Sequence, residues 1–276
     1  MRIPPGYEPS FERPVGIFGW GVSGKAVFSV VRRLGCFAIV YDEHSGEHSR
    51  PVFDDEAAAR HDLIVYSPGF APGHPWLALA RKAGCTVLSE VDFASLFWEG
   101  PIVAVTGTNG KTTLTNFLVG ALRAQGVEAV AAGNIGYPFS RLLEMVRSVE
   151  TVLVLELSSF QTETLEKLRP HAVIWTNFAE DHLDRHATEK AYFLAKYRLV
   201  AQLQRPRLLV GASVAGAAER LDVHLPSYAR TVRPDSAQPP EGSALAMGPQ
   251  RTNTSPWKHS KRPRGTSLRR ATACAR

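Results

Sequence analysis

The residues best suited to chemistry lie in segment 107–113, Gly-Thr-Asn-Gly-Lys-Thr-Thr, between an apolar strand at 102–106 and an amphipathic helix at 114–125. Such a loop points backbone N–H groups at an anion, and the helix N-terminus favours negative charge. We expect the Lys111 ammonium to reach the β and γ phosphates of a nucleotide and the Thr112 hydroxyl to bind Mg²⁺. The expected ATP-binding residues are Gly107, Thr108, Asn109, Gly110, Lys111, Thr112 and Thr113.

This segment departs from the usual phosphate-loop pattern at one position. The pattern has a glycine five residues before Gly110, where this sequence has Val105. The alternative interpretation is an ordinary strand-to-helix turn.

Two further apolar strands end in side chains that suit a metal or a phosphate. Glu156 ends the strand at 151–156, and magnesium prefers one or two carboxylates together with phosphate and water. The strand at 172–176 precedes Asn-Phe-Ala-Glu-Asp-His-Leu-Asp, in which the imidazole of His182 could bind a metal or orient a phosphate. Without the nucleotide loop, both segments would be interpreted as surface groups or helix caps.

A second glycine turn, Gly-Trp-Gly-Val-Ser-Gly at 19–24, separates an apolar strand at 15–18 from a helix at 25–34. The next strand, 37–41, ends at Asp42, which is the pattern of a Rossmann-like half with an acidic residue for a ribose hydroxyl. Ser67 and Gly69 follow a strand at 63–66 and should lie at the same ligand-binding edge. Taken alone, this turn would equally suit NAD(P).

The elements that must position these residues alternate between strand and helix. Further strands are expected at 86–88, 128–131 and 207–210, and the helix at 189–202 carries Lys196, which by itself would be interpreted as a surface residue. Gly100 and Pro101 mark the start of a second unit. We predict an α/β fold of two consecutive doubly wound domains, a Rossmann-like domain at 1–99 and a P-loop domain at 100–233.

The charge distribution separates the end of the chain from the rest. The net charge is +6, but eight basic residues lie from Arg251 onward and no acid follows Glu241, so the preceding part is not basic. Segment 234–276 is rich in Pro, Ser, Gly and Arg, and we expect a disordered tail that could be out of frame. No run is apolar and long enough to span a membrane, and the N-terminus has no signal-peptide pattern, which favours a cytoplasmic location.

Four segments in order resemble the Mur ligase family. They are Gly-Thr-Asn-Gly-Lys-Thr-Thr at 107–113, Gly-Asn-Ile-Gly at 133–136, Glu-Leu-Ser-Ser-Phe-Gln at 156–161, and Asn177 with Glu-Asp-His-Leu-Asp at 180–184. The second and third are most similar to the D-glutamate-adding branch of the family. The resemblance covers about residues 15–210, and we expect the family's third α/β domain to be missing.

The resemblance implies an ATP-dependent ligation of D-glutamate to UDP-N-acetylmuramoyl-L-alanine in peptidoglycan precursor synthesis, through an acyl phosphate. By the same matching, Thr112 and Glu156 would hold one Mg²⁺, and His182 a second, with Lys196 as a metal-bridging carbamate. Lys111, His182 and Lys196 would be the catalytic residues. A carbamate requires a neutral amine, so the pKa of Lys196 should be lowered. The implied substrate-binding residues are Gly19, Gly21, Val22, Ser23, Gly24, Asp42, Ser67, Gly69, Asn134, Ser158 and Ser159.

Other functions stay open at this point. Without a third domain, ligation would be impaired, and the chain could be a fragment that binds UDP-muramoyl peptide or ATP without ligating. The turn at 19–24 leaves an NAD(P)-dependent oxidoreductase as a further alternative. The basic tail permits a nucleic-acid-binding arm, although we expect a monomer that binds no nucleic acid.

Overall fold

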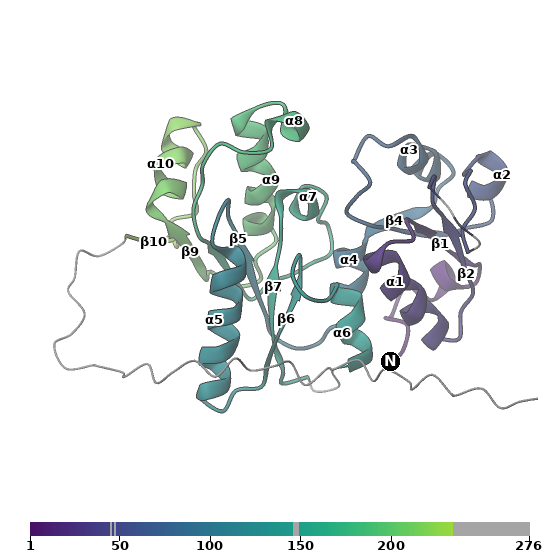
Figure 1. Cartoon of the computed structure of the whole chain (residues 1–276), viewed down its shortest axis with the longest axis horizontal. Coiled ribbons are helices and arrows are strands. Elements are labelled where there is room, and N and C mark those ends of the chain that lie inside the picture. Colours follow the sequence, from purple (N-terminus) through teal and green to yellow (C-terminus); the bar gives the residue numbers. More distant parts are fainter. Residues whose placement is uncertain (45, 47, 146–148, 234–276) are drawn as a thin grey trace, which may run out of the picture. The chain divides into compact units, whose positions relative to one another are not determined.

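The computed structural model describes residues 1–44, 46, 48–145 and 149–233. Met1–Pro234 forms one compact unit. The predicted disordered tail at 234–276 lies outside the described residues. Two parallel sheets, one of four strands and one of six, confirm the predicted α/β class, while the domain boundary between residues 99 and 100 stays a prediction (Figure 1).

The first sheet contains β1 (Val15–Phe18), β2 (Ala38–Tyr41), β3 (Leu63–Tyr66) and β4 (Thr86–Ser89), in the order β2-β1-β3-β4. Its strands are short runs of Val, Ile, Leu and aromatic residues, as expected for a parallel sheet buried on both faces. The intervening helices are η1 (Glu8–Phe11), α1 (Val22–Arg33), α2 (Asp55–Ala58), α3 (Pro75–Lys82) and α4 (Glu90–Ser95).

The second sheet places β5 (Ile102–Thr106) between β7 (Val152–Glu156) and β8 (Ala172–Trp175). The remaining strands are β6 (Ala129–Gly133), β9 (Leu208–Gly211) and β10 (Arg230–Val232), and the order is β10-β9-β8-β5-β7-β6. All strands are parallel, so the chain segments that follow β5, β7 and β8 meet at one edge of this sheet. Its helices are α5 (Lys111–Ala124), α6 (Phe139–Met145), α7 (Ser159–Thr162), α8 (Leu183–His186), α9 (Glu189–Ala201) and α10 (Ala212–Arg220).

Most elements lie within a few residues of their predicted bounds, and two differences concern the site. Helix α5 begins at Lys111 rather than at residue 114, so the phosphate loop runs directly into the first helical turn. Helix α1 begins at Val22, inside the predicted glycine turn. Strand β10 was not predicted because its three residues are exposed and give no apolar pattern.

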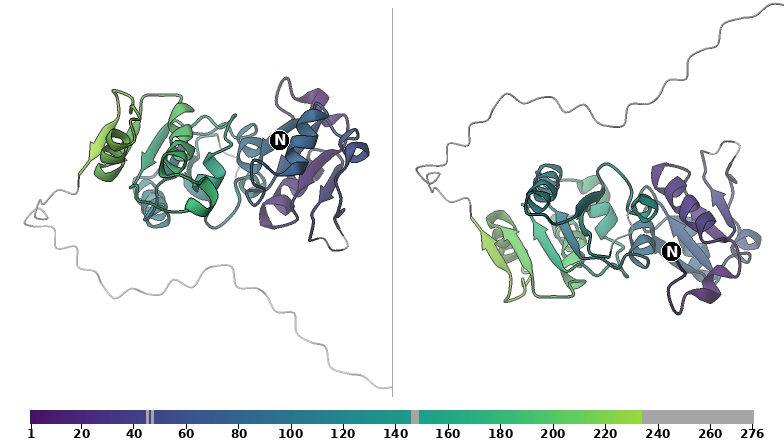
Figure 2. Two further views of the ribbon diagram at one scale, coloured as in Figure 1. Left: turned by 90° about the horizontal axis from the view of Figure 1, so that it is seen from above. Right: turned by 90° about the horizontal axis from the view of Figure 1, so that it is seen from below.

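One hydrophobic core contains buried residues from the strands of both sheets, such as Ile17 and Val173. Figure 2 shows the ribbons of the two sheets from two further sides. The buried carboxylate of Asp92 in α4 accepts hydrogen bonds from the backbone N–H groups of Glu166, Lys167 and Leu168, at 2.9, 2.9 and 3.0 Å. These hydrogen bonds connect helix α4, which follows β4, to the segment between β7 and β8. Among the described helices, none is long and apolar enough to cross a membrane.

Candidate nucleotide and metal site

The loop between β5 and α5 has a backbone that only glycine adopts easily. Gly107 has a φ of +149°, and a Cβ there would lie 1.9 Å from Thr176 Oγ1 at the end of β8. Gly110 has a φ of +76° and immediately precedes α5. A side chain at Gly107 would therefore push the loop off β8.

The segment after β8 holds this loop in place. The side-chain amide of Asn177 accepts a hydrogen bond from the Asn109 N–H at 2.8 Å and donates one to the Asn109 carbonyl at 2.9 Å. Thr176 donates a second hydrogen bond to the same carbonyl at 2.8 Å. The Thr108 hydroxyl accepts from the Ala179 N–H at 3.1 Å. The loop conformation is thus fixed from outside. The N–H groups of Thr108 and Asn109 are bonded to Asn177, so an anion would be bound by the N–H groups that follow them at the start of α5.

Two lysines donate hydrogen bonds to one carbonyl of the loop. Lys111 Nζ lies 3.0 Å from Gly107 O and 2.8 Å from Thr108 O. Lys196 Nζ, from α9, lies 2.9 Å from Gly107 O, and its residue is only 1% exposed. Burial, and secondly the charge of Lys111, lower the pKa of Lys196 to about 7. A large fraction of Lys196 is therefore a neutral amine at neutral pH.

Glu156 ends β7 beside the first turn of α5 and is buried. Its Oε2 accepts a hydrogen bond from Thr112 Oγ1 at 2.8 Å, and its Oε1 accepts one from Asn134 Nδ2 at 3.0 Å. A carboxylate next to a hydroxyl at a phosphate loop fits the oxygen chemistry of Mg²⁺. Within the described residues, no three His, Cys, Asp or Glu side chains gather as a metal site, so such an ion would also need phosphate or water ligands.

His182 lies just before α8, with its side chain 45% exposed. Its backbone φ is +53°, and its ring packs against Phe160 with the centroids 5.0 Å apart. Its Nε2 lies 3.4 Å from Asp181 Oδ2. The imidazole is therefore accessible, and the loop after β8 brings it to the same edge as Glu156 and the phosphate loop.

Ser158 and Ser159 differ in their surroundings. Ser158 is half-buried and caps α7, where Gln161 completes a capping box. Ser159 is 2% exposed, and its Oγ lies 3.0 Å from His186 Nε2. Ser158 is therefore better placed than Ser159 to contact a substrate directly.

The glycine turn after β1 opens onto a cavity of about 550 Å³. Asp42 organises this turn, since its carboxylate accepts hydrogen bonds from the N–H groups of Trp20 and His44 at 2.6 and 2.9 Å. A Cβ at Gly24 would lie 1.8 Å from the carbonyl oxygen of Gly19, so the first turn of α1 requires a glycine there. The cavity is lined by Gly19, Gly21, Val22, Ser23, Asp42, Glu43, His44, Ser67, Pro68, Gly69, Phe70 and His74.

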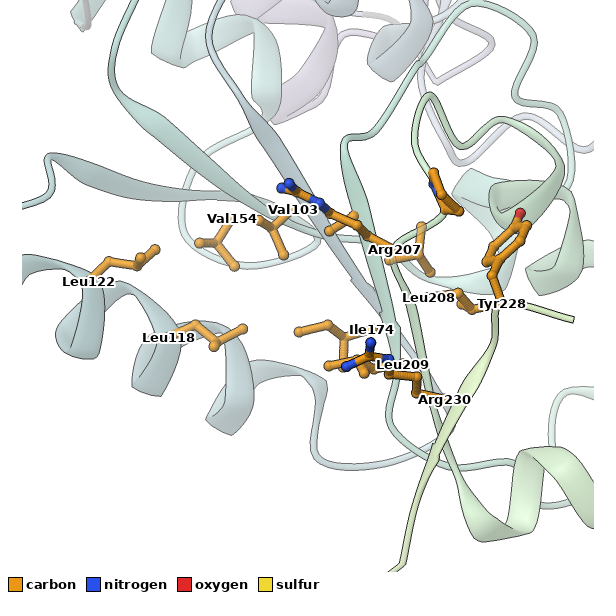
Figure 3. Close-up of a pocket in the computed structure, with 13 residues that line it drawn as sticks. Val103, Leu118, Leu122, Val154, Ile174, Arg207, Leu208, Leu209, Tyr228 and Arg230 are labelled. Carbon is orange, nitrogen blue, oxygen red and sulfur yellow. The ribbon is translucent and has the colours of Figure 1, made fainter. Parts of the chain in front are cut away.

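A different cavity, of about 500 Å³, lies between α5 and the strands beside it (Figure 3). Leu118 and Leu122 of α5 face Val103, Val154 and Ile174 of the sheet. Its charged lining residues are Arg207 and Arg230. This apolar lining does not suit a triphosphate, and the phosphate loop remains the better candidate site.

Sequence reasoning missed several residues that surround the predicted ones. Tyr192 lies with its hydroxyl 3.3 Å from Thr108 Oγ1, and its ring is 4.7 Å from Lys196 Nζ. The sequence also did not indicate His186 or Glu163, which lies 3.7 Å from it, because single polar residues at short helices give no periodic pattern. His74 caps α3 and lines the cavity at the turn after β1. The proline that follows it, in His-Pro-Trp at 74–76, is typical of a helix start and could have indicated this cap.

Comparisons with known proteins show which family this sequence resembles. The model of the Mur ligase middle domain matches residues 105–219. The UDP-N-acetylmuramoylalanine--D-glutamate ligase of Geobacter metallireducens is 40% identical over an alignment of 198 residues, which covers 66% of this chain and 44% of that protein. The ligase of the same name from Lactococcus lactis subsp. lactis is 33% identical over 218 residues, covering 72% and 47%. The chain thus spans less than half the length of these curated relatives.

Among solved structures, a ligase from Neisseria meningitides shares the fold. It is the UDP-N-acetylmuramate:L-alanyl-gamma-D-glutamyl-meso-diaminopimelate ligase, with a TM-score of 0.54 and 16% sequence identity. The likeness covers 80% of this chain and 77% of that one. At this identity the likeness supports the arrangement of elements.

Proposed function

Residues 105–219 belong to the Mur ligase family, and from this premise we propose that the chain takes part in the ATP-dependent ligation of D-glutamate to UDP-N-acetylmuramoyl-L-alanine. The proposal includes a cytoplasmic place in peptidoglycan precursor synthesis. We propose D-glutamate as the amino acid because the relatives that are 33 and 40% identical to this chain are D-glutamate ligases.

One observation carries the proposal: a buried lysine with a lowered pKa lies at the phosphate loop. Binding a nucleotide requires only the loop and Lys111, whereas Lys196 adds a second, largely neutral amine 2.9 Å from the Gly107 carbonyl. A neutral amine can still donate one N–H to this carbonyl while its lone pair attacks CO₂. The new N–C bond forms a carbamate and one proton leaves, which would supply an extra carboxylate for Mg²⁺.

The loop residues would bind and orient the triphosphate. Lys111 now donates to two carbonyls of its own loop, and phosphate oxygens would replace these acceptors and draw its charge toward the β and γ positions. Thr112 and Glu156 would hold one Mg²⁺ and His182 a second, with the Lys196 carbamate as a shared ligand. These ions would neutralise phosphate charge when bound. Positioning and charge neutralisation account for most catalysis in phosphoryl transfer.

The cavity at the turn after β1 would bind the UDP group of the sugar substrate. Val22 and Ser23, in the first turn of α1, line this cavity, and the backbone N–H groups of a helix N-terminus would suit a diphosphate there. Asp42 lies at the end of β2, where it could accept a hydrogen bond from a ribose hydroxyl. Asn134, Ser158 and Ser159 would line the path of the muramoyl group toward Lys111.

A product assay tests the proposal. The chain is incubated with ATP, Mg²⁺, UDP-N-acetylmuramoyl-L-alanine and D-glutamate, alone and joined to the part of the Geobacter relative that it does not span. Formation of the D-glutamyl product by the joined protein, and its loss in Lys196→Ala, would support the ligase. Binding of both substrates without product in either protein would favour a non-ligating fragment instead.

A further inference from the structure

The segment around α8 is held in a strained backbone. Neither His182 nor Ala187, the residues on either side of α8, is glycine, yet their φ angles are +53° and +60°. Such angles are uncommon for residues with a Cβ and persist only where surrounding contacts enforce them. Four-residue α8 has too few internal hydrogen bonds to do this alone. The restraint must therefore come from other elements.

Three side chains connect α8 to the residues around α7. Arg185 binds the Glu163 carboxylate through Nε, at 3.1 Å, and through Nη2. His186 places Nε2 3.0 Å from Ser159 Oγ and Nδ1 3.7 Å from Glu163 Oε2. The exposed fractions of these side chains are 18% for Arg185, 14% for Glu163 and 4% for His186. We call Glu163, Arg185 and His186 the α8 bracket.

The α8 bracket is coupled to His182 through one aromatic ring. The Arg185 guanidinium lies 4.5 Å from the Phe160 centroid, and the His182 ring packs on the same Phe160 at 5.0 Å. The His182 ring also contacts Tyr192, with the centroids 6.1 Å apart. Since the Tyr192 hydroxyl reaches Thr108 at 3.3 Å, this packing leads to the phosphate loop. The His182 side chain is exposed, while the groups packed around it are buried or half-buried.

We propose that Glu163, Arg185 and His186 are positioning residues that hold the strained α8 segment so that the His182 imidazole faces the nucleotide site. Direct contact with ligand is left to His182. Its role toward Mg²⁺ rests on the proposed function, whereas the placement of its ring does not. Because the ion pair makes a two-point contact and the guanidinium stacks on Phe160, a lysine at position 185 should not replace the arginine.

The first test measures the His182 ring by NMR, which needs no ligand. His182→Ala identifies its resonances among those of the nine histidines. In Arg185→Lys and in Glu163→Gln, the His182 ring protons should move toward the shifts of an unstructured histidine, since stacking on Phe160 is lost. The matched control is Arg60→Lys, which breaks an exposed Arg–Glu pair with Glu56 on α2 and should leave these protons unchanged.

The second test is a double-mutant cycle on Mg²⁺-dependent ATP binding. Arg185→Lys should weaken this binding by about tenfold, as outer partners of metal ligands commonly do. In a His182→Ala background the same substitution should have no further effect, because the bracket acts through the imidazole. Additive effects would overturn the proposal, as would unchanged His182 resonances in a folded Arg185→Lys variant. Failure of the wild-type chain to bind ATP would instead count against the proposed function, and the NMR result would still decide the bracket.

Discussion

At the scale of single residues, the Gly107 carbonyl oxygen receives hydrogen bonds from two lysine side chains. Burial of Lys196, and secondly the nearby charge of Lys111, lower the pKa of Lys196. Lys111 is half-buried at the start of α5, whereas Lys196, on α9, is buried. Lys111 would thus contact phosphate, whereas Lys196 supplies an amine that can react.

The first prediction concerns Lys196 and pH. Its folded pKa of about 7 lies below that of an unfolded lysine, about 10.4. Between these values the unfolded chain binds a proton that the folded chain does not, so the free energy of unfolding should rise with pH, by up to about 1.4 kcal/mol per unit. Below pH 7 both states are protonated, and the cost of burying the charge is present in full.

Lys196→Met should therefore remove this slope and raise the free energy of unfolding at pH 7. Urea unfolding of both proteins at pH 6, 7, 8 and 9 measures it. An identical slope in the two proteins would mean that Lys196 keeps an ordinary pKa.

The second prediction is that Lys111→Ala abolishes Mg-ATP binding but preserves the fold. The Lys111 ammonium contacts only loop carbonyls and fills no core position, so its removal costs little packing. Calorimetry measures the affinity and circular dichroism the fold. Unchanged Mg-ATP affinity in a folded variant would contradict the phosphate-loop interpretation.

At the scale of elements, the buried Asp92 carboxylate of α4 joins two regions that are far apart in the chain. It satisfies three backbone N–H groups at 166–168, and burial raises its pKa while those hydrogen bonds lower it. An alanine would remove the acceptor of these three N–H groups, of which that of Leu168 is in a buried residue. We predict that Asp92→Ala lowers the free energy of unfolding by about 3 kcal/mol, since hydrogen bonds to charged groups are strong.

Urea unfolding measures this loss, and Asp55→Ala is the control, because Asp55 is exposed in the first turn of α2. A loss of equal size in both variants would show that the Asp92 hydrogen bonds do not contribute to the free energy of unfolding beyond the effect of removing an exposed aspartate.

At the scale of the whole molecule, the two proposed ligand sites belong to one compact unit, so their ligands should stabilise it separately. We predict that UDP-N-acetylmuramoyl-L-alanine and Mg-ATP each raise the melting temperature and that NADH does not. A ligand at 100 times its Kd adds about 2.7 kcal/mol to the free energy of unfolding.

Two variants assign each response to its site. Ser23→Asp places a carboxylate at the cavity after β1 and should abolish only the UDP-sugar response, whereas Lys111→Ala should abolish only the ATP response. A melting shift with NADH, lost in Ser23→Asp, would support the oxidoreductase alternative.

The sequence by itself determined the strands other than β10, their order along the chain and the loop at 107–113. Runs such as Ile102–Thr106 are apolar enough to be buried on both faces, and glycines at 107 and 110 show where the backbone must turn. These features are local, so periodicity and spacing reveal them. The same reasoning placed Asp42 and Glu156 at strand ends.

Only the tertiary structure decided which distant side chains meet. A lysine in a helix such as α9 is ordinarily solvated, and its burial depends on packing against a carbonyl 89 residues earlier. Likewise, Glu163 and Arg185 are 22 residues apart and Asp92 and Leu168 are 76 apart. No pattern along the chain encodes these pairs, because their geometry exists only once the strands of each sheet have taken their order.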